Sequence, residues 1–198
     1  MRAKGMNLGL DGRDFDINML VAPLRSMARH ENLCRSHKHQ KGDVILRHGD
    51  AVSDTFVLET GLVKLVYPMA NGDEWIKSFI VDQGIFGSVD EGDAAQPSRF
   101  SAHTIEPGTY IRLPLRWVKR AVAASAELTA AYIAFSGWVR RRKEEREEAL
   151  LCASAEENYR RFLSGNANLV QRLPQGDIAR YLGVTPVAFS RIKRRMQL

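Results

Sequence analysis

The hydrophobic positions along this 198-residue chain change their spacing twice. Residues 16–29 carry apolar side chains at helical spacing, and Pro23 inside this run predicts a bend or a break. Residues 33–113 instead contain short runs rich in Val, Ile, Phe and Thr, separated by turns that contain glycine. From Leu115 onward the helical spacing returns. The order predicts an α+β protein with an N-terminal β-roll or jelly-roll region followed by helices.

Six runs in the middle of the chain are typical of strands. They are Val44–Leu46, Thr55–Glu59, Leu62–Tyr67, Trp75–Val81, Ser101–Ile105 and Tyr110–Leu113. Asn71–Gly72, between the third and fourth runs, is a strong hairpin signal. Thr60–Gly61 and the segment 106–108 also predict turns, so each is expected to end one strand and begin the next. Residues 165–169 are expected to form a loop.

The longest predicted helix extends from about Ser125 to Ala153 and carries one apolar stripe in its first half. The stripe repeats at steps of four, three and four residues, which is the spacing of a coiled-coil seam. Its members are Leu128, Tyr132, Phe135 and Val139. This stripe favours a homodimer, with burial against the chain's own β region as the alternative. The run 140–148 that follows is mixed in charge and predicts a solvated face.

The last turn-rich stretch, residues 175–195, predicts two short helices joined by a tight turn. Gly183 stands where the chain must turn sharply and a left-handed conformation is needed. Thr185 is then a suitable N-cap, and Pro186 a suitable first residue of the second helix. A helix-turn-helix has this pattern, and its second helix enters the major groove of DNA. A short helical hairpin inside a core is the alternative.

Charge favours the DNA interpretation over the core hairpin. The formal net charge is +6, and residues 150–198 hold 8 Lys and Arg against 3 Asp and Glu. The rest of the chain is almost balanced, at 21 against 20. A basic excess confined to one end indicates a polyanionic partner, most often nucleic acid. The residues expected to face double-stranded DNA are Thr185, Ser190, Arg191, Lys193, Arg194 and Arg195.

Several short motifs occur in a specific order along residues 16–198. They are Lys41–Leu46 with Gly49–Asp50, Phe56–Lys64, Gly84–Gly87, Ile178–Thr185 and Ser190–Ile192. In this order they resemble the Crp/Fnr family of bacterial transcription regulators. The resemblance implies a cyclic-nucleotide-binding-like sensor at 1–114, connecting and dimerisation helices at 115–153 and a helix-turn-helix domain at 154–198. It also implies a homodimer on a near-palindromic operator, with RNA polymerase as a further partner.

One departure from the family's pattern concerns the ligand. Ser88 stands where the cyclic-AMP-binding members have a Glu that holds the ribose hydroxyls. Arg99 lies near the position of their phosphate-binding Arg, at a spacing one residue longer. A serine cannot accept two hydroxyls as a carboxylate does. We therefore expect no cyclic-nucleotide cofactor, and Ser88 and Arg99 remain the candidates for an effector pocket.

A second departure concerns the operator. Pro186 and Val187 stand where many members of the family have an Arg–Glu pair that contacts bases. Arg191 matches a base-contacting Arg of the family, and an arginine can bind guanine through two hydrogen bonds. DNA binding is therefore expected to be retained, with a different target sequence.

Two interpretations from other classes remain open. A cupin-like metal-binding enzyme domain is also a jelly roll, and His37, His39 and Asp43 faintly imitate its metal site. The glycines that such a site requires around them are missing, so we predict neither a metal site nor an enzyme. A dimeric protein-interaction module is the other alternative, and it would show no salt-dependent affinity for DNA.

Cysteine spacing and hydropathy predict a cytoplasmic location. Cys34 and Cys152 lie far apart without metal-ligand spacing, as expected for reduced thiols. Residues 1–16 lack the apolar core of a signal peptide. The weakly polar run 121–139 contains Glu127 and is a poor membrane span, so no membrane partner is expected.

Overall fold

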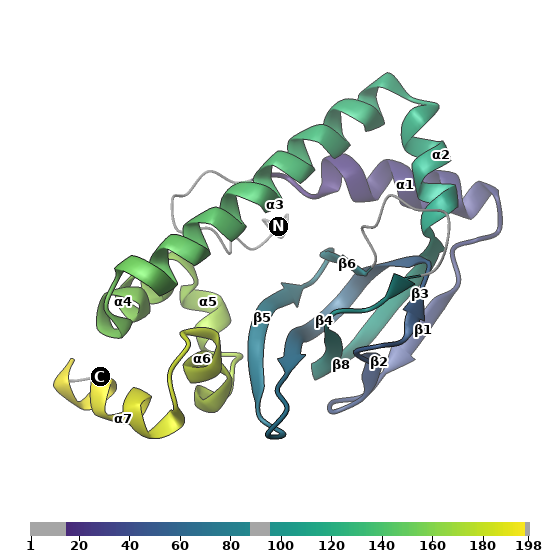
Figure 1. The fold of residues 1–198 in the computed structure, drawn as a ribbon. Coiled ribbons are helices and arrows are strands. Elements are labelled where there is room, and N and C mark those ends of the chain that lie inside the picture. Colours follow the sequence, from purple (N-terminus) through teal and green to yellow (C-terminus); the bar gives the residue numbers. More distant parts are fainter. Residues whose placement is uncertain (1–14, 88–95, 197–198) are drawn as a thin grey trace.

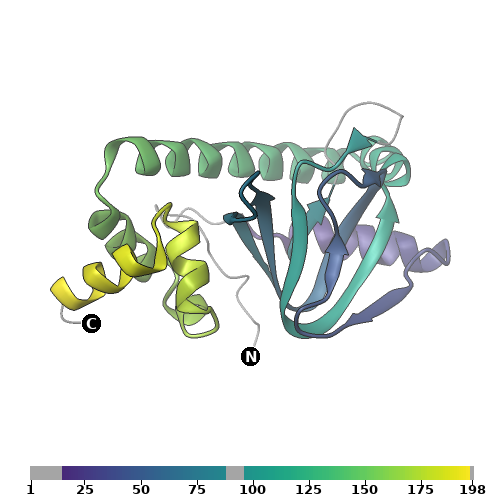
Figure 2. The same ribbon diagram turned by 60° about the horizontal axis from the view of Figure 1, so that its bottom comes forward.

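The computed structural model describes residues 15–87 and 96–196. A β-roll and a group of C-terminal helices lie side by side, and one long helix runs along both (Figures 1 and 2). The helices are α1 (Asn18–His30), α2 (Leu115–Ala123), α3 (Ala126–Cys152), α4 (Ala155–Gly165), α5 (Ala167–Val170), α6 (Gln175–Tyr181) and α7 (Pro186–Arg195). The strands are β1 (Ser36–His39), β2 (Val44–Leu46), β3 (Ala51–Val52), β4 (Asp54–Pro68), β5 (Glu74–Val81), β6 (Ile85–Gly87), β7 (Gln96–Pro97) and β8 (Ser101–Pro114). The α+β prediction is confirmed.

All strand pairs in the roll are antiparallel. The main sheet has the order β1-β8-β4-β5, with β2 added to β8 and β6 added to β4. Strands β3 and β7 form a separate pair. Strands β4 and β8 are long and pair along most of their length, so they form the central strand pair of the roll.

Two predicted turns are wrong, because Thr60–Gly61 lies inside β4 and the segment 106–108 lies inside β8. The two irregular segments face each other in the sheet, where the register shifts on both sides of Thr60. Pairing therefore continues through the irregularity instead of ending at it. A Cβ on Gly108 would clash with the carbonyl oxygen of Thr60, so this glycine permits close approach of two strands.

Two local expectations also differ from the structure, and one strand had no signal in the sequence. Pro23 does not break α1, which is continuous from Asn18 to His30. The predicted loop at 165–169 contains most of the short helix α5. The segment that holds His37 and His39 is strand β1, paired with β8. All four of its residues are polar, so it gave no strand signal in the sequence.

The C-terminal helices share a hydrophobic core with the sheet. Leu62, Ile76 and Phe79 of β4 and β5 belong to the same buried cluster as Phe162 of α4 and Ile178 of α6. Figure 1 shows α6 beside β5. Residues 153 and 154 link α3 to α4. The roll therefore positions the helices that follow this link.

A separate buried cluster joins α1, α2, the beginning of α3 and the roll. Leu20 and Leu24 of α1 pack there with Trp117 of α2 and Leu128 of α3. Ser125 caps α3 by accepting a hydrogen bond from the amide of Leu128 at 3.2 Å. In the described part of the chain no single helix is long and apolar enough to cross a membrane, although α2 and α3, bent by 120°, pass that test as a pair.

Candidate nucleic-acid interface

The turn between α6 and α7 forms as its residues dictate. Gly183 has φ 75°, a left-handed conformation that glycine adopts without strain. The amide of Val184 donates to the carbonyl of Ala179 at 3.0 Å and closes the turn. The hydroxyl oxygen of Thr185 accepts from the amide of Ala188 at 3.2 Å, and Pro186 is the first helical residue. Local chemistry therefore fixes where α7 begins.

One face of α7 anchors it to the protein. Phe189 is 2% exposed and Ile192 is also buried. The ring of Phe189 meets the ring of Tyr159 of α4 edge-on, with 4.8 Å between centroids. Burial of a side chain of this size contributes several kcal/mol to stability. The anchored face holds α7 in one orientation, and the opposite face is left for contact with a partner.

The outward face of α7 is polar and basic except at its beginning. Its exposed members are Val187, Ser190, Arg191 and Arg194. They follow helical spacing of three, four and seven residues and so lie on one side of the helix. No carboxylate within the described residues lies within ion-pair distance of Arg191 or Arg194. Among the described residues, no carboxylate therefore neutralises the positive charge of these two guanidinium groups.

The six residues predicted to face DNA all lie on α7 or at its cap, in different situations. Thr185 is exposed but uses its oxygen as the helix cap. Lys193 is half-buried on the flank of the anchored face. Arg195 is exposed and lies 3.9 Å from Glu156 of α4. Ser190, Arg191 and Arg194 point outward together, and of the six they are best placed to contact a ligand.

Of the two candidates for an effector pocket, the structure describes only Arg99. Ser88 lies outside the described residues. Arg99 is exposed in the segment between β7 and β8. Burial raises the pKa of Tyr67, and the positive charges of Arg146 and Arg99 oppose this rise, which places Arg99 near the end of β4.

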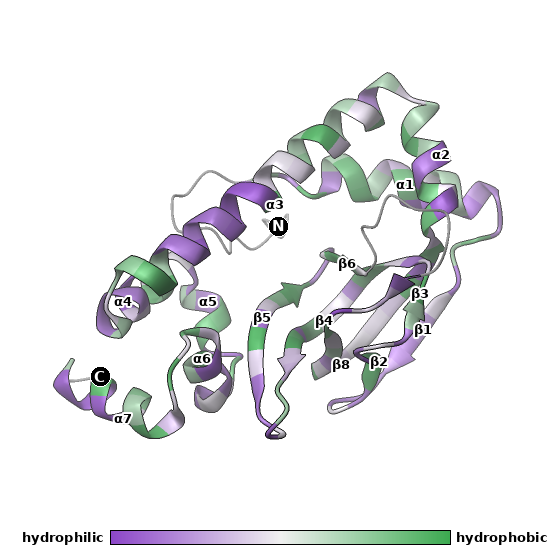
Figure 3. Ribbon diagram, in the orientation of Figure 1, coloured by the Kyte–Doolittle hydropathy of each residue, from purple (hydrophilic) through white to green (hydrophobic). Residues whose placement is uncertain are grey.

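The apolar stripe of α3 is divided between two environments. Leu128 is buried inside the subunit, and Phe135 is half-buried, 5.8 Å from Phe15 between ring centroids. Tyr132 is exposed, and its neighbour Ile133, outside the predicted stripe, is 66% exposed. Val139 is half-buried. Figure 3 shows that the first half of α3 is rich in hydrophobic residues and that the second half is mostly hydrophilic.

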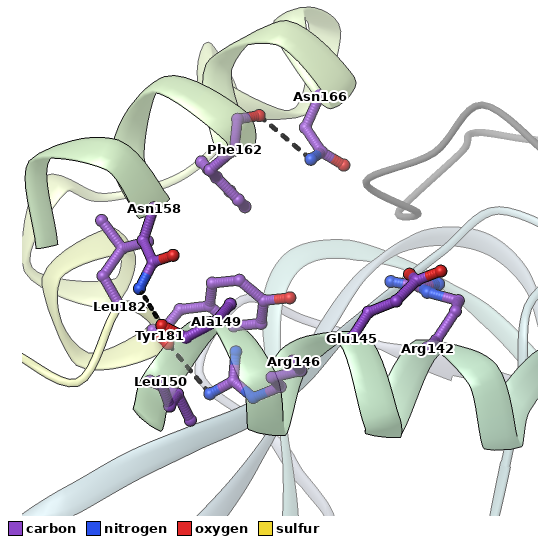
Figure 4. A pocket seen from close by; sticks show the side chains of 10 residues that line it. All are labelled: Arg142, Glu145, Arg146, Ala149, Leu150, Asn158, Phe162, Asn166, Tyr181 and Leu182. Carbon is purple, nitrogen blue, oxygen red and sulfur yellow. Dashed lines mark hydrogen bonds between the residues drawn. The ribbon is translucent and has the colours of Figure 1, made fainter. Parts of the chain in front are cut away.

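Arg146 of α3 joins the roll to the helix-turn-helix, a role that the sequence did not indicate. Its Nη2 atom donates to the carbonyl of Ile76 of β5 at 2.8 Å and to that of Tyr181 of α6 at 2.9 Å. Its guanidinium carbon lies 3.9 Å from the centroid of the Tyr181 ring. Figure 4 shows Arg146 reaching Tyr181 beside a small pocket between α3, α4 and α6. Arg146 therefore departs from the solvated face predicted for 140–148.

Two ion pairs join the same regions. Lys64 of β4 lies 3.0 Å from Asp177 of α6, and both side chains are largely buried. Arg172, just before α6, donates from Nε to Glu106 of β8 at 2.9 Å. The hydrogen bond from Arg172 lowers the pKa of Glu106 below its usual value. The sequence separation of each pair hides it from any local pattern.

The histidines that faintly imitate a cupin metal site lie in β1. The His37 ring stacks on Tyr110 with 5.3 Å between centroids. His39 is buried, and neither of its ring nitrogens has a hydrogen-bond partner among the described residues. Burial lowers the pKa of His39. In residues 15–87 and 96–196, no three His, Cys, Asp or Glu side chains are placed to hold a metal ion.

Comparison with known proteins places this arrangement among known folds. Residues 36–125 match the family model of the cyclic nucleotide-binding domain. The chain is 25% identical over 169 residues to Electron transport regulator A of Shewanella oneidensis, which covers 80% of this chain and 67% of that relative. This similarity extends beyond the roll into the helices.

Solved structures of regulators also resemble this chain over both the roll and the helices. FixK2 from Bradyrhizobium japonicum superimposes with a TM-score of 0.70 at 19% identity, over 83% of this chain and 84% of that one. CLP from Xanthomonas campestris, described as a c-di-GMP responsive global regulator, gives 0.68 at 12% identity, over 88% and 91%. The resemblance predicted from the sequence is thereby confirmed: the chain has the fold of the Crp/Fnr regulators, with a domain of the cyclic nucleotide-binding type at residues 36–125.

Proposed function

We propose that this chain is a sequence-specific DNA-binding transcription regulator that acts as a homodimer on a near-palindromic operator. One observation carries the proposal: α7 is anchored by Phe189 and Ile192 while Arg191 and Arg194 face outward without an acidic partner in the described residues. A helix held in this way can enter the major groove with its cations toward the DNA.

The second copy of the chain is proposed to pack on α3. Tyr132 and Ile133 expose apolar surface in the first third of this helix, and Leu151 is 78% exposed near its end. A two-fold dimer through α3 would present two copies of α7 to half-sites about 34 Å apart. Ile133→Glu should convert the dimer to a monomer in sedimentation analysis, whereas Glu144→Ala on the same helix should not. A dimer that survives Ile133→Glu would contradict this interface.

The roll is proposed to act as the sensor, with RNA polymerase as a further partner of the bound regulator. The contacts of Arg146, Lys64 and Arg172 give a physical connection from the sheet to α6, which precedes the proposed recognition helix. The roll carries no proposed cyclic nucleotide, because Ser88 cannot replace a carboxylate on the ribose. The protein is proposed to act in the cytoplasm as a regulator and not as an enzyme.

Selection of bound DNA from a random pool tests the proposal most directly. The expected result is one enriched sequence with two-fold symmetry and half-sites one helical turn apart. Binding should also weaken steeply with salt, with a slope of about −0.9 in log–log terms for each phosphate contacted. Absence of both enrichment and salt-dependent binding would contradict it and favour a protein-interaction module.

A further inference from the structure

Val187 is an exposed hydrophobic residue at the second position of α7. Its exposed fraction is 65%, and it belongs to none of the three buried clusters formed by the described residues. It is β-branched, so helix propensity gives no reason for its presence there. Within the subunit, Val187 therefore contributes little to folding, and a role at the outer surface of α7 accounts for it better.

The position of Val187 on α7 aligns it with the polar and basic residues of the outward face. Arg191 follows it by four residues, which is about 40° around the helix and about 6 Å along its axis. Ser190 and Arg194 flank the same line. The N-terminal residues of a recognition helix are those that contact base edges in the major groove. If α7 enters DNA, Val187 enters first among these side chains.

The chemistry of valine limits what it can recognise in the groove. Its side chain has no hydrogen-bond donor or acceptor, so it cannot match the polar edges of guanine, cytosine or adenine. Thymine alone presents an apolar group there, its 5-methyl. We propose that Val187 contacts a thymine methyl group in each operator half-site, beside the base that Arg191 binds. This inference rests on the proposed function and adds one element of the operator sequence.

Helix geometry restricts where this thymine lies. The rise of about 6 Å between Val187 and Arg191 corresponds to at most two base pairs at about 3.4 Å each. The selected operator should therefore contain a thymine within two base pairs of the guanine whose recognition is lost in Arg191→Ala. An operator without such a thymine would overturn the inference while leaving DNA binding intact.

Replacement of thymidine by deoxyuridine isolates the proposed contact, because it removes the methyl group and keeps every hydrogen-bonding edge. With the wild-type protein, this change at the predicted position should weaken binding about fourfold per half-site, as expected for one buried methyl group. The same change at other thymines of the operator should have little effect. Equal affinity for the two operators would overturn the inference.

The variant Val187→Ala should bind the thymine and uracil operators with equal affinity. Val44→Ala is the matched control, since Val44 is also exposed but lies on β2 of the roll. It should keep the fourfold preference. A Val187→Ala protein that retains the full preference would assign the methyl contact to another residue and overturn the inference. A wild-type protein that binds no DNA would instead contradict the proposed function as well.

Discussion

Helices α6 and α7 are neighbours in the sequence and differ in how their charged side chains are used. Asp177 of α6 is 5% exposed and is paired with Lys64 of the roll. Arg191 and Arg194 of α7 are exposed, without a carboxylate partner in the described residues. A charge that finds its partner inside the subunit fixes the position of a helix. A charge without one is available to an external polyanion.

The same contrast holds along α3. Arg146 is half-buried and donates to carbonyl groups of both β5 and α6. Arg140, less than two turns earlier, is exposed, and among the described residues it pairs only with Glu144 on its own helix, at 3.2 Å. Exposed pairs of this kind contribute about 0–1 kcal/mol to stability. Two arginines with the same charge on the same helix therefore have different roles, because different groups surround them.

The largest expected effect comes from removal of the α7 anchor. Phe189→Ala should lower the free energy of unfolding by about 3–5 kcal/mol, because it leaves a cavity against Tyr159. Val187→Ala on the exposed side of the same helix should change it by less than about 0.5 kcal/mol. Urea titration followed by circular dichroism measures both. Similar values for the two variants would show that α7 has no anchored face.

A smaller loss is expected from breaking the α6 contact with the roll. Asp177→Ala should cost about 2 kcal/mol, because it leaves the largely buried Lys64 ammonium without its carboxylate. Glu144→Ala, which breaks the exposed pair with Arg140, should cost about 0.5 kcal/mol or less. Chemical denaturation compares the two, and a double-mutant cycle with Lys64→Met isolates the pair. A coupling free energy near zero would show that the Lys64–Asp177 pair does not stabilise the contact between α6 and the roll.

Removal of an unpaired charge on α7 should affect DNA binding and not folding. Arg191→Ala should weaken specific binding by about 1–3 kcal/mol and relax the preference at one base position. Its free energy of unfolding should stay within about 0.5 kcal/mol of the wild type. Arg161→Ala on α4, where the side chain pairs with Glu157, is the control and should leave affinity unchanged. Equal weakening on every DNA sequence would make Arg191 a phosphate contact.

The smallest effect concerns pH. His103 of β8 lies near both Lys64 and Asp177, and burial lowers its pKa below the usual value of 6.5, with Lys64 and Arg47 acting in the same direction and Glu74 and Asp177 opposing. Because the unfolded chain then binds the proton more tightly, the free energy of unfolding should fall as pH drops below about 6.5.

His39 should contribute to the pH dependence with the same sign, since burial lowers its pKa as well. Urea titrations at pH 7.5 and 5.5 measure the difference. Replacement of both histidines by glutamine should flatten the dependence in this window. Stability that rises on acidification would contradict the assignment.

Much of the candidate interface could be predicted from residues close together in the chain. Gly183, Thr185 and Pro186 each act through their own backbone or that of a residue three positions away, so the turn and the beginning of α7 follow from local rules. The spacing of Phe189 and Ile192 gave the buried face in the same way. The exposed Ile133 was missed because it lies outside the heptad stripe, and the stripe also does not show that Leu128 is buried within the subunit.

The strands show where local rules fail. Gly61 and Gly108 carry ordinary turn signals, and nothing near them in the sequence says that β4 and β8 meet at that point. Because the irregularities coincide across the pair, two long strands form where four short ones were expected. The hydrogen bonds that the irregular segment of β4 needs come from the facing part of β8, which lies more than 40 residues away in the sequence.

The sequence alone determined the order of elements, the helix-turn-helix and the basic character of its second helix, since these depend on spacing within a few turns. Only the tertiary structure decided that Asp177 pairs with Lys64, that Arg146 joins β5 to α6, and that Leu128 is buried within the subunit. Each of these contacts joins segments brought together by the sheet topology. The free energy of each contact depends on how deeply and at what distance two segments meet, which neither segment determines alone.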